Sequence, residues 1–236
     1  MICVLFSGGL DSMLLAEIAH RQNVLGSLFH VSYGQRASAQ EYRAAQQYAS
    51  KRDLSLERAI ISVRGLDDMN QEPGVSGARV VPARNLIMIA HAVNYSVACG
   101  YDQIWYGACA DDVADYTDCR PAFVMALDNL TASASGIRIR APLINKTKAQ
   151  IINLSKSYGI DQKEAWSCYA PKNDAPCGRC NSCTSSSRSG SEEASKWKWA
   201  TECCKDRDNH RCDPGTQIIE CVSCGGLVLE GAHDSR

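Results

Sequence analysis

Short apolar runs alternate with helix-like stretches along most of the chain. The runs that are short enough to be buried strands cover residues 1–6, 24–31, 54–63, 102–107 and 137–140. Apolar residues recur at helical spacing in the stretches between and after them, at 13–19, 37–52, 86–98, 123–132 and 147–157. This alternation predicts an α/β fold in which helices cover a doubly wound parallel sheet of about five strands.

The first junction between a strand and a helix carries a glycine turn. Gly8 and Gly9 allow the backbone to approach an anion closely, and the first helical turn adds unpaired N–H groups. The serine hydroxyls can donate further hydrogen bonds, and Asp11 is placed to hold a magnesium ion. An alternative is a plain connection in which Asp11 or Ser12 caps the helix. The predicted nucleotide-binding residues are Phe6, Ser7, Gly8, Gly9, Leu10, Asp11 and Ser12.

Three segments after the third predicted strand could add to this site. Arg84 lies near the start of a helix, where its charge opposes the helix dipole, so it either faces a phosphate or is a solvated arginine. Four aspartates within residues 111–118 follow a predicted strand, which is where substrate contacts belong in a parallel sheet, although a solvated loop has the same composition. Residues 64–81, rich in glycine and acidic residues, are expected to form a surface loop over the site.

Composition excludes several classes of function. The formal net charge of −1 gives no reason to expect a nucleic-acid partner. The sequence shows no apolar stretch long enough to span a bilayer and no signal peptide, so we expect a cytoplasmic protein without a membrane partner. Of its 13 cysteines, nine fall within residues 168–224. Two-residue gaps between many of these indicate metal sites in a reducing compartment, not secreted disulfides.

The first cysteine cluster has the spacing of a closed metal site. Its members are Cys168, Cys177, Cys180 and Cys183. Four thiolates suit tetrahedral zinc, and short C-x-x-C turns direct two thiolates toward one point. An iron–sulfur cluster is the rival, but the usual spacing of its fourth ligand would fall on Ser187. The sequence therefore predicts structural zinc with no open coordination position.

The chain divides into three parts. Residues 1–183 form the predicted nucleotide-binding domain with its zinc site, 184–200 a linker rich in serine, glycine and charge, and 201–236 a cysteine-rich tail. Strand-like runs at 216–220 and 225–229 flank the Cys221–Cys224 pair, as in a zinc ribbon. The second ligand pair of this zinc ribbon would come from among Cys203, Cys204, His210 and Cys212. The alternative is a disordered tail.

Six groups of motifs in residues 1–183 resemble the 7-cyano-7-deazaguanine synthase family, the queuosine-pathway branch of the PP-loop ATP-pyrophosphatases. They are residues 7–12, 33–36, 82–85, 116–121, 142–144 with 147–148, and 166–169 with 177–183. The Asp118–Pro121 segment and the cysteine cluster are the most specific of these, because many PP-loop enzymes share the first. The resemblance implies an adenine nucleotide alpha hydrolase-like fold.

The resemblance also implies a reaction. ATP, with Mg²⁺, would activate 7-carboxy-7-deazaguanine, and ammonia would convert it through an amide into the nitrile. Catalytic roles would fall to Asp11, Arg84, Asp118 and Arg120, with Asp118 or Arg120 recognising the polar edge of the deazaguanine. The alternatives are a related enzyme that stops at the amide, transfers the activated deazaguanine elsewhere or thiolates tRNA, and a non-catalytic adaptor. A homodimer is left open.

Overall fold

Five parallel strands form the centre of the molecule, which is described here from a computed structural model. The strands are β1 (Ile2–Leu5), β2 (Leu25–Ser32), β3 (Leu56–Ile60), β4 (Gln103–Trp105) and β5 (Arg138–Arg140). Their order is β3-β2-β1-β4-β5, and every neighbouring pair is parallel. This order confirms the predicted doubly wound sheet, and it places β1 at its centre.

The structure describes residues 1–63, 81, 83–114, 116–180 and 182–183, together with three short strands between 210 and 229. Of the surface loop predicted over 64–81, residues 64–80 lie outside the described residues, as do Pro82 and Asp115. Among the described residues, no helix combines the length and the apolar character that crossing a membrane requires.

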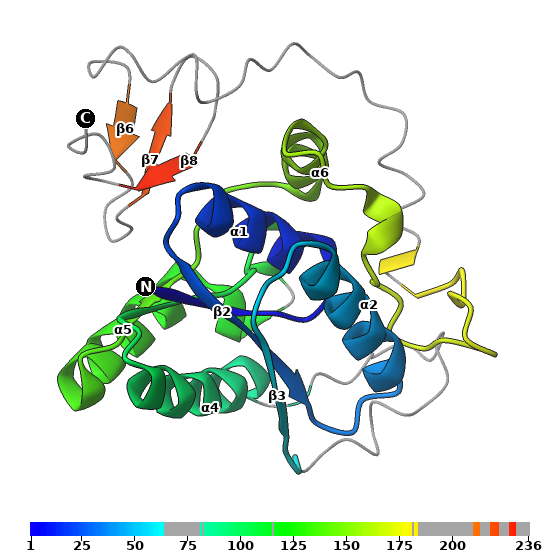
Figure 1. The fold of residues 1–236 in the computed structure, drawn as a ribbon, viewed down its shortest axis with the longest axis horizontal. Coiled ribbons are helices and arrows are strands. Elements are labelled where there is room, and N and C mark those ends of the chain that lie inside the picture. Colours follow the sequence, from blue (N-terminus) through cyan, green and yellow to red (C-terminus); the bar gives the residue numbers. More distant parts are fainter. Residues whose placement is uncertain are drawn as a thin grey trace.

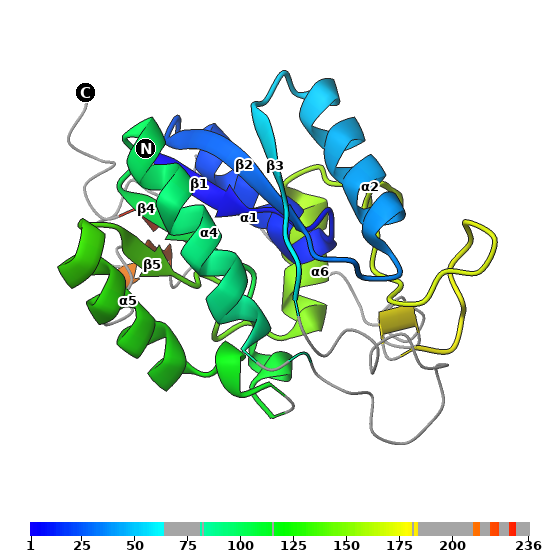
Figure 2. The ribbon, with the colours of Figure 1, turned by 90° about the horizontal axis from the view of Figure 1, so that it is seen from below.

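Helices cover both faces of the sheet (Figure 1). One face carries α1 (Leu10–Arg21), α2 (Ser38–Lys51) and α6 (Lys148–Ser157), whose apolar residues share one core cluster. The other face carries α4 (Arg84–Cys99) and α5 (Pro121–Ser135), which lie in front of the strands in Figure 2. These five helices agree with the five helical stretches predicted from the sequence.

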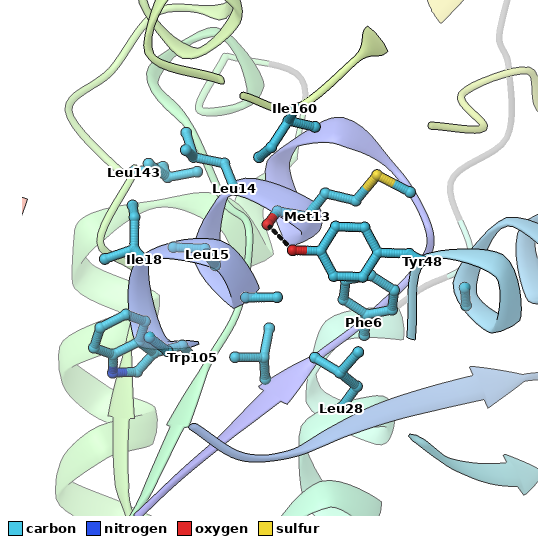
Figure 3. Packing of buried hydrophobic residues seen from close by; sticks show 14 of the residues in the cluster. Phe6, Met13, Leu14, Leu15, Ile18, Leu28, Tyr48, Trp105, Leu143 and Ile160 are labelled. Atoms are coloured by element: carbon cyan, nitrogen blue, oxygen red, sulfur yellow. Dashed lines mark hydrogen bonds between the residues drawn. The ribbon is translucent and has the colours of Figure 1, made fainter. Parts of the chain in front are cut away.

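The core beneath α1 fixes the position of the loop that precedes this helix. Met13, Leu14, Leu15 and Ile18 are almost fully buried against the sheet and the neighbouring helices (Figure 3). The hydroxyl of Tyr48 on α2 donates a 3.2 Å hydrogen bond to the carbonyl oxygen of Met13, which links the two helices. Each such buried side chain stabilises the fold by about 1.5–3 kcal/mol.

Two of the helices begin with residue types that favour a helix start. Thr147 caps α6 in a capping box with Gln150, and Pro121 occupies the first turn of α5. At α1 the N-cap is Gly9, with no side-chain hydrogen bond. Asp11 and Ser12 therefore do not cap α1, and the alternative of a plain capped connection is wrong in this respect.

A second, antiparallel sheet is formed by β6 (His210–Cys212), β7 (Ile218–Cys221) and β8 (Leu227–Leu229). Its last two strands pair as a hairpin across the segment that contains Cys224, where the sequence indicates one. Cys203, Cys204 and Cys224 lie outside the described residues, so the zinc ribbon and the domain boundaries stay predictions.

Candidate functional site

The loop between β1 and α1 lies at the point where the order of the sheet reverses. Strand β2 lies on one side of β1 and β4 on the other, and the carboxyl end of a strand at such a switch point is where open parallel sheets bind ligands. Gly8 has a φ of +81°, and a Cβ atom there would lie only 2.5 Å from the carbonyl oxygen of Glu41. On the other side, a Cβ atom on Gly107 would lie 3.0 Å from Cβ of Asp11. The loop is therefore held closely between α2 and the end of β4.

Hydroxyl groups line this loop, which we call the phosphate loop (Ser7–Ser12). Gly9 N–H donates to Oγ of Ser7 at 3.2 Å, and the hydroxyl of Ser12 donates to the carbonyl oxygen of Gly9 at 2.8 Å. The two hydroxyl oxygens are 3.3 Å apart. Ser7 is exposed and Ser12 is buried, so the loop has one hydroxyl facing solvent and one fixed behind it. A group of donors at a helix N-terminus is the arrangement that binds phosphate.

Lys148, the first residue of α6, reaches across to Asp11. Its Nζ lies 2.5 Å from Oδ2 of Asp11 and 3.6 Å from Oδ2 of Asp112, and its backbone N–H donates to Asp111 at 2.7 Å. Burial alone would lower the pKa of Lys148, but the Asp11 and Asp112 carboxylates outweigh it and raise that pKa above its ordinary value. Burial raises the pKa of Asp11, and the ammonium group of Lys148 opposes this shift.

Lys148 is the residue that the motif analysis missed as a site member. Its sequence context, directly after a helix-capping threonine, indicates only a helix start. Residues 147–148 are among the motifs that carry the family resemblance. That membership was the one sequence signal that could have identified Lys148 as a site residue. Two of the four aspartates of the 111–118 segment, Asp111 and Asp112, thus contact a lysine that itself contacts the phosphate loop.

Arg84 is half-buried at the first turn of α4. Its guanidinium donates to the hydroxyl of Tyr33, which follows β2, at 3.4 Å. Burial would lower the pKa of Arg84, but Tyr33, Tyr169 and Asp118 raise it, so the group remains charged. The charge is therefore directed toward the carboxyl end of β2 and away from free solvent.

Asp118 and Arg120 have different surroundings. Asp118 is buried, and its Oδ2 accepts a 3.0 Å hydrogen bond from the backbone N–H of Asn85 in the first turn of α4. Arg120 is exposed, and its Nε donates to the carbonyl oxygen of Val113 at 3.2 Å. Asp118 is thus joined to the helix that carries Arg84, whereas Arg120 faces solvent.

The four predicted metal ligands converge. The sulfur atoms of Cys168, Cys177, Cys180 and Cys183 all lie within 4.8 Å of one another. The backbone N–H of Cys177 donates to Sγ of Cys168 at 3.2 Å, and that of Cys180 donates to Sγ of Cys177 at 3.4 Å. Four soft donors around one point fit a tetrahedral metal ion, and N–H donors of this kind orient thiolate ligands. This group, the cysteine cluster, can hold a metal ion.

Two other cysteines lie near the proposed catalytic groups. Cys109 donates to Oδ2 of Asp112 at 3.2 Å, and Cys119 follows Asp118. Burial raises the pKa of both thiols to about 12. Both are therefore neutral thiols at physiological pH, and neither has the character of a nucleophile.

A family model described as "Queuosine biosynthesis protein QueC" matches residues 1–194. The chain belongs to the QueC family. The match includes the phosphate loop, Arg84, Lys148 and the cysteine cluster, and it extends beyond Cys183, where the motif resemblance ended.

Two relatives align with this chain over most of their own length. The 7-cyano-7-deazaguanine synthase of Marinobacter nauticus is 31% identical over 77% of this chain and 88% of the relative. That of Anaeromyxobacter dehalogenans is 35% identical over 77% of this chain and 87% of the relative.

Among solved structures, NMN synthetase from Francisella tularensis has a TM-score of 0.49 and 16% identity, over 76% of this chain and 69% of that one. The U34-tRNA thiolase NcsA from Methanococcus maripaludis has a TM-score of 0.48 and 12% identity, over 75% of this chain and 61% of the thiolase.

Proposed function

We propose that this protein converts 7-carboxy-7-deazaguanine and ammonia into 7-cyano-7-deazaguanine at the expense of ATP. The observation that carries the proposal is the phosphate loop of a QueC-family chain, placed at the switch point of the sheet beside Asp11 and Lys148. The product is the one in the names of two relatives that are 31% and 35% identical to this chain over the aligned residues.

The chemistry explains why such an enzyme needs a phosphate site. A carboxylate is a poor electrophile because oxide would have to leave. Transfer of AMP from ATP to the carboxylate releases pyrophosphate and gives an acyl-adenylate, from which ammonia displaces AMP to form the amide. A second ATP adenylates the amide oxygen with loss of pyrophosphate, and departure of AMP with a proton leaves the nitrile. Pyrophosphate thus departs twice, and stabilising its charge is the main electrostatic task.

The phosphate loop supplies the donors for that task. Backbone N–H groups at the start of α1 and the exposed Ser7 hydroxyl would bind the departing pyrophosphate. Asp11 would hold Mg²⁺, which when bound neutralises phosphate charge. Lys148 lies on the same carboxylate and is held in its charged form, so it would direct a positive charge at the phosphates once Asp11 binds the cation.

Arg84 and Asp118 would serve the organic substrate. Arg84 keeps its charge in a half-buried position, where it would orient the carboxylate and offset developing negative charge. One oxygen of Asp118 binds the backbone of Asn85, which leaves the other for the polar edge of the deazaguanine. Arg120, which is exposed at the same turn, would contact the polar edge of the deazaguanine from the solvent side.

The cysteine cluster is proposed to bind zinc in a structural role. Four protein thiolates fill a tetrahedral shell and leave no position for substrate. A tRNA-thiolating function would need a reactive thiol near the phosphate loop. Cys109, which donates to Asp112, and Cys119, which follows Asp118, are buried with raised pKa values, so their protonation favours the nitrile-forming reaction over sulfur transfer.

One assay tests the proposal. The full chain is incubated with ATP, Mg²⁺, ammonium and 7-carboxy-7-deazaguanine, and the products are identified by mass. Formation of the nitrile with two AMP per product is the expected result. Accumulation of the amide alone would show that the reaction stops one step earlier, and absence of ATP turnover with this substrate would overturn the proposal.

A further inference from the structure

Trp166 contacts the phosphate loop through its backbone. Its N–H donates a 2.9 Å hydrogen bond to the carbonyl oxygen of Gly8. A Cβ atom on Gly9 would lie 3.5 Å from the carbonyl oxygen of Trp166, so the backbone around Trp166 runs directly along the glycine pair. The segment that ends in the cysteine cluster therefore forms one wall of the phosphate loop.

This hydrogen bond fixes a peptide group that the proposed ATP site uses. The carbonyl of Gly8 and the N–H of Gly9 belong to one trans peptide, which is planar, so they point in opposite directions. With the carbonyl held by Trp166, the Gly9 N–H points toward the Ser7 hydroxyl, 3.2 Å away. A glycine pair has little intrinsic preference between orientations. If the peptide turned over, it would present a carbonyl oxygen to the phosphate.

Trp166 is itself held from two sides. Its indole Nε1 donates to the carbonyl oxygen of Cys168 at 2.8 Å, which joins it to the cysteine cluster. Two residues before it, Glu164 pairs with Lys51 and, at 3.3 Å, with Arg52 on α2. Of these two anchors only the cysteine cluster depends on a metal, because the ion pairs on α2 are formed by the fold alone.

We propose that Trp166 is a positioning residue for the phosphate loop, and that the metal-loaded cysteine cluster keeps it in place. The inference rests on the proposed ATP site and deepens it. A metal bound to Cys168 holds the carbonyl that Trp166 contacts, and Trp166 in turn holds the Gly8–Gly9 peptide with its N–H toward the Ser7 hydroxyl and its carbonyl oxygen turned away from the phosphate. The cysteine cluster thus acts on ATP binding without touching ATP.

The first test separates positioning from general stability. Trp166→Phe keeps an aromatic ring and the backbone N–H but removes the bond to Cys168, and we expect it to weaken ATP–Mg²⁺ binding, measured by calorimetry, roughly five- to tenfold. The matched control is Tyr95→Phe, which removes the 3.2 Å bond from Tyr95 on α4 to Ser27 on the opposite face of the sheet from α1. The control should lower the melting temperature, because it loses a hydrogen bond between α4 and β2, and leave ATP affinity unchanged.

The second test follows the hydrogen bond itself. We expect removal of the metal with a chelator, and separately Trp166→Phe, to increase amide hydrogen exchange of Trp166, because its N–H is protected only while it binds Gly8. In turnover, Trp166→Phe should raise the KM for ATP and leave that for ammonium unchanged.

The outcomes are distinguishable. If the wild-type chain binds ATP but Trp166→Phe and the metal-free protein bind it equally well, the positioning role is wrong and the proposed function stands. If equal losses of affinity occur in Trp166→Phe and Tyr95→Phe, the effect is one of stability and the inference is likewise overturned. If the wild-type chain binds no ATP, both the inference and the proposed function fail.

Discussion

The phosphate loop and the cysteine cluster are both short segments with a clear sequence signature, but they are held in different ways. The loop lies between α2, β4 and α6, with buried residues of α1 directly behind it. The cysteine cluster lies after α6 in the chain, most of residues 171–179 are exposed, and neither Cys168 nor Cys180 belongs to the two apolar cores. The fold therefore shapes the loop, whereas the cysteine cluster is proposed to be held together by a bound metal ion.

The largest effect is expected at the loop. Asp11→Asn keeps the size of the side chain but removes the charge that would hold Mg²⁺, so turnover should fall at least about 10³-fold, which is about 4 kcal/mol of transition-state stabilisation. Far-UV circular dichroism should be unchanged, because α1 has no cap from Asp11. Asp102→Asn, an exposed change elsewhere, is the control. A variant that keeps more than a tenth of the activity would remove Asp11 from the ATP site.

A smaller loss is expected at Lys148. Lys148→Met preserves much of the side-chain length without its charge, and we expect kcat/KM for ATP to fall about 10²-fold. Lys156→Met on the exposed side of the same helix tests whether any lysine of α6 has this effect. If the two variants have equal activity, the contact between Lys148 and Asp11 is only a structural ion pair.

The cysteine cluster should respond differently. Cys168→Ala should reduce the metal content by one equivalent per chain, measured by atomic absorption. It should lower ATP affinity by about tenfold, while the helical content stays the same because both apolar cores lie elsewhere. A matched change is Cys99→Ala, an exposed cysteine on α4 outside the cluster. Loss of the whole fold in Cys168→Ala would show that the two regions are not separable.

The smallest effect is a difference in thiol reactivity. With pKa values near 12, Cys109 and Cys119 should carry thiolate in only about one molecule in 10⁴ at pH 8. Iodoacetamide should therefore leave both unlabelled in the native protein, and the labelling should rise only on unfolding or as the pH approaches 12. The cluster cysteines should be labelled as soon as the metal is removed, as peptide mass spectrometry can follow. Rapid labelling of Cys109 at pH 8 would reopen the thiolase alternative.

Much of the fold could be predicted because its signals are local. Five apolar runs, five helical stretches and the capping box at Thr147 each depend on neighbours within a few residues, and the structure has them in these places. The cysteine cluster was equally accessible, because two C-x-x-C gaps direct neighbouring thiols toward one point and Cys168 supplies a fourth. The capping role considered for Asp11 or Ser12 was wrong, since a glycine in extended conformation starts α1 instead.

The sequence by itself thus determined the order of the elements, the glycine turn at residues 7–12 and the four clustered thiols. Only the tertiary structure decided what surrounds them. Lys148 lies 137 residues from Asp11, and Trp166 is brought to Gly8 from beyond the last strand of the sheet. Contacts of this kind arise because parallel strands place their carboxyl ends, and the segments that follow them, at one edge of the sheet. No local pattern of residues encodes which of those segments will meet.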